Sequence, residues 1–409
     1  MLRYPFLVSV STAIALAACG TAAPLGGGGG ENGDAGKVTT DGAVPFTPPV
    51  VNRSLGMNDV SFLLPLPKGS EPVLFRASDA AGDGAPFLPK DLVTRVTTVP
   101  DHASDFFITY EHLQITAVRF DVCDRNTATP CNASEDGRLR VVYQPTSSES
   151  VSDVGFHVFY AIPRAKLGEA VAGLRELATL QAEPITSPLK VHPMLSKEAE
   201  GGPYHTKLRA FLAKYISSSK IMRLTVMTQS AVSAAFRWVF HGMERSNETE
   251  DFHDITIPIA NVTTQDVLLL NAASYELTPK ADSPVGSSVA FSNTKFAEAT
   301  QEARSTALSA LASADNPTMG SPATVQCVTC HVSTVITAHR TKELSIDPKT
   351  IASRYQAPYD LSITTPNTLE DDSLLRGFGW RSKSPSISQR VVNETAQVLS
   401  DCETQFPTK

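Results

Sequence analysis

The sequence predicts an α+β fold over residues 51–285, followed by a mainly helical region over residues 286–409. Apolar and polar residues alternate repeatedly in the middle of the chain, which favours a mixed or antiparallel sheet. Two stretches of helical periodicity, 165–180 and 204–215, interrupt this alternation, and we expect them to pack on one face of the sheet. The expected strands lie at 139–143, 156–160, 224–226, 238–240, 255–257 and 267–270.

The first 18 residues have the order of a cleaved export signal. Arg3 precedes an apolar run of about a dozen residues, too short to span a membrane, and small residues follow it. The sequence Leu16-Ala17-Ala18-Cys19 resembles the lipobox of bacterial lipoproteins. That resemblance implies that Cys19 is acylated, for example with palmitate, and becomes the first mature residue. The alternative is an ordinary secretory signal in which the cysteine is incidental.

Residues 19–50 are expected to form a disordered tether. The run from Gly26 to Gly30 and its Gly-rich and Thr-rich continuation contain too little apolar surface to offset the entropy of an ordered chain. Gly20 in the second mature position resembles lipoproteins that are sent to the outer membrane. We therefore expect a protein of the cell envelope that is held to a membrane by lipid on Cys19.

Length and charge limit the classes of function. The region beyond the tether has about 360 residues, more than one hydrophobic core usually serves, which suggests two domains. The formal charge of −7 and the absence of a Lys or Arg run argue against a nucleic-acid partner. No second apolar stretch of the sequence reaches membrane-spanning length.

Export places the six cysteines in an oxidising compartment. Cys123 and Cys131 bracket a turn-like stretch, 124–130, which follows a strand-like run at 118–122. This spacing predicts a local disulfide that closes the loop, and two separate thiols are the alternative.

The strongest chemical motif is Cys327-Val328-Thr329-Cys330-His331. The C-x-x-C-H spacing is that of a c-type haem attachment site. Two cysteines three positions apart at the start of a helix can each form a thioether with a haem vinyl group, and His331 then lies under the iron as the proximal ligand. The alternatives are a plain disulfide, a thioredoxin-like redox pair and half of a zinc site. The loop at 316–322 disfavours the thioredoxin-like pair. A zinc site requires another pair of ligands, and only Cys402 is left.

The motif and about 120 residues around it resemble a c-type cytochrome. Helical spacing occurs before it at 296–311 and after it at 387–402. Ser384-Pro385-Ser386 is expected to start the second helix, with a capping serine and either Pro385 at the first helical position or Gln389 as a capping-box partner. The order of helix, haem motif and helix resembles small class I cytochromes, which implies a cytochrome c-like C-terminal domain with one covalent haem c.

The sequence departs from that family at the distal iron ligand, which is normally a methionine downstream of the motif, because no methionine follows Met319. Met319 and His339 are the candidates near the motif. His339 lies eight residues after His331, about 12 Å along a continuous helix, so only a helix break would let it serve. Three other histidines become candidates only if the preceding domain covers the haem: His205, His241 and His253.

The expected function is electron transfer with a redox protein partner. A haem enzyme with an open iron, such as a peroxidase, is a lower-ranked variant, because known bacterial cytochrome c peroxidases carry two haems and this sequence has one motif. Polar residues of the middle region are expected to be ordinary sheet or surface residues, because no nucleophile accompanies them: His157, Arg237, His241 and Glu244. Cys402 is expected to be buried on an apolar helical stripe. The alternative function is a surface-anchored binding or structural lipoprotein without a cofactor, in which Cys327 and Cys330 form a disulfide.

Overall fold

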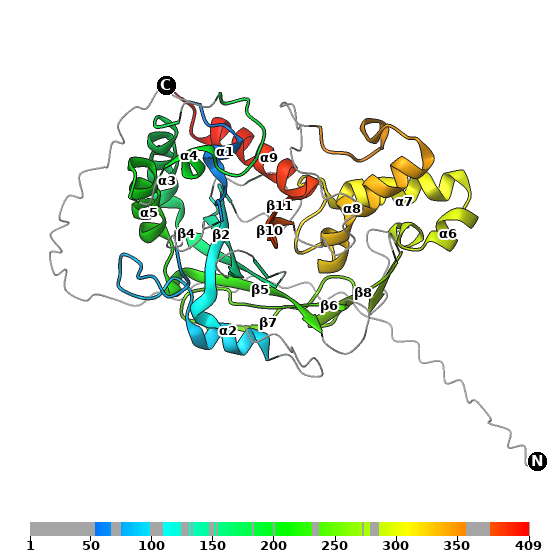
Figure 1. Cartoon of the computed structure of the whole chain (residues 1–409), viewed down its shortest axis with the longest axis horizontal. Coiled ribbons are helices and arrows are strands. Elements are labelled where there is room, and N and C mark those ends of the chain that lie inside the picture. Colours follow the sequence, from blue (N-terminus) through cyan, green and yellow to red (C-terminus); the bar gives the residue numbers. More distant parts are fainter. Residues whose placement is uncertain are drawn as a thin grey trace, which may run out of the picture. The chain divides into compact units, whose positions relative to one another are not determined.

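An antiparallel sheet lies at the centre of the computed structural model (Figure 1). Nine strands of the described residues form it in the order β1-β2-β3-β4-β5-β6-β8-β9, and β7 pairs with β6. The strands are β1 (Ser61–Leu63), β2 (Leu113–Asp121), β3 (Gly137–Pro145), β4 (Gly155–Ile162), β5 (Ile221–Ser230), β6 (Arg237–Glu244), β7 (His253–Asp254), β8 (Thr264–Asn271) and β9 (Ser274–Thr278).

The structure describes thirteen stretches of the chain. These are residues 54–66, 75–98, 109–123, 131, 134–146, 151–152, 154–181, 184–198, 201–230, 237–271, 274–278, 286–356 and 377–408. The predicted signal peptide, lipidated cysteine and tether lie outside them. All described residues belong to one compact unit, 47–409.

Alternation in the sequence sets the two faces of the sheet, because successive side chains of a strand point to opposite sides. In β3, Leu139, Val141 and Tyr143 are fully buried on one face. Their cross-strand partners in β4 include Val158 and Tyr160, which extend the same apolar face. We call this the core face.

The core face is covered by α3 (Arg164–Ala178) and α5 (Pro203–Tyr215), which bury apolar stripes against it. The approach of α3 is close: a Cβ atom on Gly137 would lie 2.3 Å from Leu167 Cδ2 of the helix and 2.8 Å from the backbone oxygen of Asp121 in β2. The backbone oxygen cannot move aside as a side chain can, so glycine suits this position. Three shorter helices are α1 (Met57–Val60), α2 (Lys90–Thr97) and α4 (Pro193–Lys197), and two 3₁₀ turns are Tyr110–His112 and Ser218–Lys220.

Helices from the C-terminal part of the chain cover the opposite face of the sheet, which we call the cavity face. In chain order, the part contains a 3₁₀ turn (Ser287–Phe291), α6 (Asn293–Glu298), α7 (Gln301–Ala314), α8 (Cys327–Leu344), a 3₁₀ turn (Pro348–Thr350), the antiparallel hairpin β10 (Phe378–Arg381) and β11 (Ser384–Ile387), and α9 (Gln389–Gln405). On the cavity face, His331 of α8 contacts Phe240 of β6, and Glu394 of α9 contacts Arg119 of β2.

The predicted α+β organisation with an antiparallel sheet is confirmed. Strands occur at 139–143, 156–160, 224–226, 238–240 and 267–270, and both predicted helices of the middle region are present. The strand predicted at 255–257 is wrong. There β7 ends at Asp254, and Ile257 forms only an isolated bridge to Val262 across a turn.

Two details of the C-terminal helices differ from prediction. The helical stretch 296–311 is two helices, because Ala299 and Thr300 are extended and the Thr300 hydroxyl caps α7 by accepting from Ala303 N. The helix cap expected at Ser384 or Ser386 is wrong, since residues 384–387 pair with β10. The true cap is Ser388, whose side chain accepts from Val391 N. The predicted boundary between residues 285 and 286 stays a prediction.

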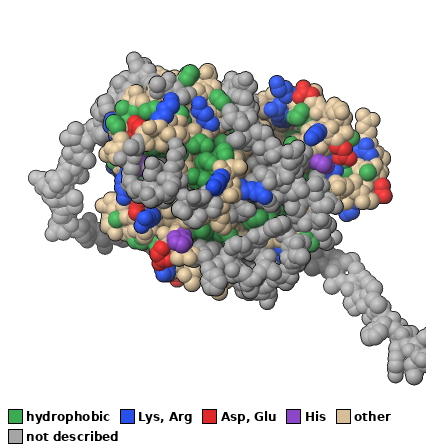
Figure 2. All heavy atoms as spheres, in the orientation of Figure 1, with side chains coloured by type: hydrophobic (Ala, Val, Ile, Leu, Met, Phe, Trp, Pro, Cys, Tyr) green, Lys and Arg blue, Asp and Glu red, His purple; other side chains and the backbone are tan. Residues whose placement is uncertain are grey.

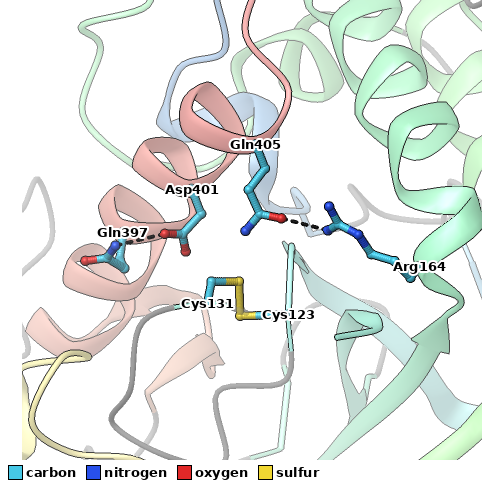
Figure 3. The surroundings of a disulfide bond; sticks show 6 residues. All are labelled: Cys123, Cys131, Arg164, Gln397, Asp401 and Gln405. Carbon is cyan, nitrogen blue, oxygen red and sulfur yellow. Dashed lines mark hydrogen bonds between the residues drawn. A yellow bond between two sulfur atoms is a disulfide. The ribbon is translucent and has the colours of Figure 1, made fainter. Parts of the chain in front are cut away.

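A disulfide joins Cys123, at the end of β2, to Cys131 (Figure 3). The two Cα atoms are 5.8 Å apart, within the usual range for such a bond. Nearby, Arg164 at the start of α3 donates to Gln405 of α9 at 2.7 Å. The cystine therefore lies where strand β2 meets the helices of both halves of the chain.

Acidic and basic side chains are interspersed on the face of the molecule shown in Figure 2, and hydrophobic side chains are exposed near its middle. No helix among the described residues is both long and apolar enough to cross a bilayer.

Candidate functional site

The C-x-x-C-H motif forms the first turn of α8, at the helix start that its spacing predicted. Gln265 of β8 holds this turn on the cavity face of the sheet. Its side-chain carbonyl accepts from Val328 N at 3.2 Å, and its side-chain NH₂ donates to the side chain of Gln326. Both glutamines are fully buried, so these hydrogen bonds form away from water and fix the start of α8 against the strand.

His331 also contacts the cavity face. Its ring centroid lies 4.8 Å from that of Phe240, at an interplanar angle of 54°. Phe240 of β6 pairs directly with Met227 of β5, so the two side chains share one face of the sheet. The sheet and the start of α8 therefore form two adjoining walls of one space.

That space is a cavity that is partly open to solvent. Cys327, Cys330 and His331 all line it. Apolar and aromatic residues make most of the remaining wall, from the sheet, from β10 and from α9. They include Val142, Phe159, Met227, Phe240, Phe378 and Val391.

The two thiols of the motif are half-buried, and neither is in a disulfide. Burial raises the pKa of the Cys327 thiol and raises that of Cys330 to about 11. Both are therefore neutral thiols near pH 7. A thioredoxin-like pair functions through a thiolate whose pKa is lowered, so this environment argues against that alternative.

Charged residues gather at one side of the cavity. Arg119 of β2, Arg140 of β3 and Arg390 of α9 are buried there, with Asp121 and Glu394 between them. Asp121 accepts from Arg119 Nε at 3.0 Å and lies 2.5 Å from Arg140 Nε. Glu394 accepts from Arg390 Nε at 2.8 Å and from Arg119 Nη1. Three cations thus face two anions.

The cluster holds Glu394 charged. Burial alone would raise the pKa of this carboxyl, but Arg119, Arg390 and Arg140 outweigh burial and bring the pKa well below its usual range. Arg119 Nη2 of this cluster is buried and has no hydrogen-bond partner among the described residues. A buried cationic N–H without an acceptor is costly, so this end of the cavity suits an anionic group of a ligand.

His157 of β4 is a second histidine on the cavity wall. It pairs across the sheet with Val142 on one side and with Thr225 on the other. Its ring lies 4.9 Å from that of Phe159. Burial, followed by the charges of Arg140 and Arg119, holds the pKa of His157 well below 6.5, so the imidazole is neutral at pH 7.

Of the other predicted ligands, only His241 borders this cavity. Met319 is 49% exposed in the turn before α8, and His339 lies on the same unbroken helix as His331. His205 of α5 stacks on Phe75, and His253 is exposed in β7. His241 borders the cavity, but its Nδ1 is 3.0 Å from Thr263 O and its Nε2 is 3.6 Å from Asp254.

Several site residues were not singled out as ligands or anion partners from the sequence: His157, Met227, Arg119, Arg140 and Arg390. A signal was present, because Arg119, Arg140 and His157 each occupy a polar position between buried apolar neighbours of a strand. Such alternation indicates a shared face of the sheet, but it does not reveal that α8 and α9 cover that face.

A haem fits the residues present. It has a broad apolar ring and two carboxylates, and the cavity has apolar walls with a cationic end whose Arg119 Nη2 lacks an acceptor. The described residues contain no group of three or more His, Cys, Asp or Glu side chains that could hold a bare metal ion. No known protein family, curated protein or solved structure matches this chain.

Proposed function

We propose that this chain is a membrane-anchored, monohaem c-type cytochrome-like lipoprotein that transfers electrons. The observation that carries the proposal is that Cys327, Cys330 and His331 line one mainly apolar cavity that also has a cationic end. A C-x-x-C-H sequence that occurred by chance would have no reason to border such a cavity. The cytochrome c-like character of the region 286–409 is part of the same proposal.

Three residues would hold the haem. Each thiol, from Cys327 and from Cys330, would add across one vinyl double bond, so that sulfur bonds to one carbon and the thiol hydrogen goes to the other. The imidazole of His331 would bind the iron from the proximal side. When bound, the haem supplies one-electron redox chemistry.

The other residues that line the cavity would set the polarity and charge around the haem. Phe240, Met227 and Phe378 exclude water from the walls of the cavity, which sets a low local dielectric. Arg119, Arg140 and Arg390 exceed their two carboxylate partners by one charge, so they attract the propionates and favour the less positive, reduced state of a cofactor.

The anchor belongs to the proposal as well. Cys19 would carry the lipid, and residues 19–50 would let the folded unit move away from the membrane to meet a redox protein partner. A lipid anchor with a flexible segment would keep the protein at the envelope, and the resemblance of Gly20 implies the outer membrane if the host is Gram-negative.

The test is expression of the full chain in a bacterial strain that attaches haem to exported proteins. Wild type should give a haem-stained band after denaturation and reduction, whereas Cys327→Ala/Cys330→Ala should give none. The matched control is Cys402→Ala, which removes a cysteine outside the motif and should retain the stain. A colourless wild type with a mapped Cys327–Cys330 disulfide would support the binding or structural lipoprotein instead.

A further inference from the structure

We infer that His157 is the second axial ligand of the haem iron, supplied by the sheet rather than by the helical region that carries the attachment motif. The inference rests on the proposed function and names a residue for the distal position.

His157 lies on the face of the sheet that borders the cavity. Gly155, Met227 and Phe240 form one row across strands β4, β5 and β6, and His157 lies two residues further along β4 on the same face. From the pairing register, Phe240 and His157 are roughly 12 Å apart at their Cα atoms. Phe240 contacts His331. The two histidines therefore border the same cavity from different walls, one from α8 and one from the sheet.

The ring nitrogens of His157 are available to bind a metal. The ring nitrogens of His157 form no hydrogen bond with any residue in the described part of the chain, and its ring contact is with Phe159. An imidazole that is partly buried in a cavity usually has a partner for its polar atoms. A neutral imidazole offers a lone pair on one nitrogen, and this is the form that binds iron.

The arginines beside His157 also favour the neutral form of its imidazole. Arg140 and Arg119 lie close enough to oppose its protonation, as does the burial of the ring. The cavity therefore presents an unprotonated ligand next to the motif.

Met227 is a competing ligand on the cavity wall, and its surroundings disfavour it. It is 6% exposed and belongs to an apolar cluster with Trp238, Phe240, Val328 and Val332. Its thioether packs as a core side chain, so turning it toward an iron would open a void in that cluster. His157 can bind without leaving a packed core.

The test compares His157→Ala with Met227→Leu, both purified as full-length haem-loaded protein. Haem staining after denaturation reports attachment, and absorption spectra of the oxidised and reduced protein report ligation. Wild type and Met227→Leu should be six-coordinate and low-spin. His157→Ala should retain covalent haem, become high-spin, and return to low-spin when free imidazole is added.

The outcomes separate this inference from the proposed function. A low-spin His157→Ala protein, or a high-spin Met227→Leu protein, overturns the role of His157 while the attached haem stands. A wild type that is already high-spin and is unchanged by His157→Ala also overturns it. A wild type without haem overturns both proposals.

Discussion

The ring of His331 lies against the ring of Phe240, with their centroids 4.8 Å apart. This contact joins the last residue of the C-x-x-C-H motif to a strand that precedes it by about 90 residues in the sequence. The motif therefore packs against the sheet and shares a cavity with it.

Gln265→Ala should weaken the docking of α8 on the sheet. The change removes the acceptor of Val328 N and the donor to Gln326, both buried. We expect the free energy of unfolding to fall by about 1–3 kcal/mol, because buried partners lose their hydrogen bonds. Urea unfolding followed by circular dichroism measures this. Gln301→Ala, at an exposed site in α7, is the control, and an equal effect in both variants would contradict the docking role.

Asp315→Asn should change how stability depends on pH. Burial raises the pKa of this carboxyl from 3.8 to about 6, although Ser333, Arg390 and Thr334 oppose the rise. Between about pH 4 and pH 6 the native state then binds a proton that the unfolded state lacks, so the free energy of unfolding falls as pH increases.

The size of this effect is on the order of 1–3 kcal/mol over that pH interval. Urea unfolding of wild type and Asp315→Asn at pH 4, 5, 6 and 7 measures it. The stability of the variant relative to wild type should increase across the interval and level off above pH 6. Parallel pH profiles for the two proteins would show that Asp315 does not titrate in this way.

Cys402 should react slowly with thiol reagents in the native protein. It is fully buried in α9, as its place on the apolar stripe predicted, and burial raises the pKa of its thiol. In a Cys327→Ala/Cys330→Ala background, iodoacetamide should label Cys402 within minutes in urea and far more slowly without it. Fast native labelling, or a disulfide-linked dimer on a non-reducing gel, would contradict its burial.

Cys19→Ala should release the protein from the membrane without unfolding it. Cys19 lies outside the described residues, and the predicted tether separates it from the folded unit. Fractionation should find the variant uncut or soluble, with the circular dichroism spectrum of the wild type. If the variant stays in the membrane fraction after a salt wash, the lipobox interpretation is wrong.

The sequence predicts local features well and their assembly poorly. Alternation located strands such as 139–143 and 156–160, and the spacing of the motif located the start of α8, because these signals depend on near neighbours. The helix break at Ala299 and Thr300 was missed. The pairing of residues 384–387 with β10 was missed too, because helical periodicity alone does not show that a hairpin competes with a helix at these residues.

The sequence likewise reveals only part of the candidate site. Cys327, Cys330 and His331 are adjacent in sequence, so their motif is visible without a structure. His157 and the cluster of Arg119, Arg140 and Arg390 come from four separate elements. Their meeting depends on the order of the strands and on α9 packing across β2, and no short-range pattern encodes either feature.

The intact mass of the purified wild-type chain tests the central claim most directly. After denaturation and reduction, the protein expressed with haem-maturation machinery should be heavier by one haem, and a protease digest should locate the added mass on the peptide that contains Cys327, Cys330 and His331. His331→Ala should lose most of this product, since attachment requires the histidine together with both cysteines. A wild-type chain whose cysteine peptide has the mass of the bare sequence, or of a simple disulfide, would contradict the account.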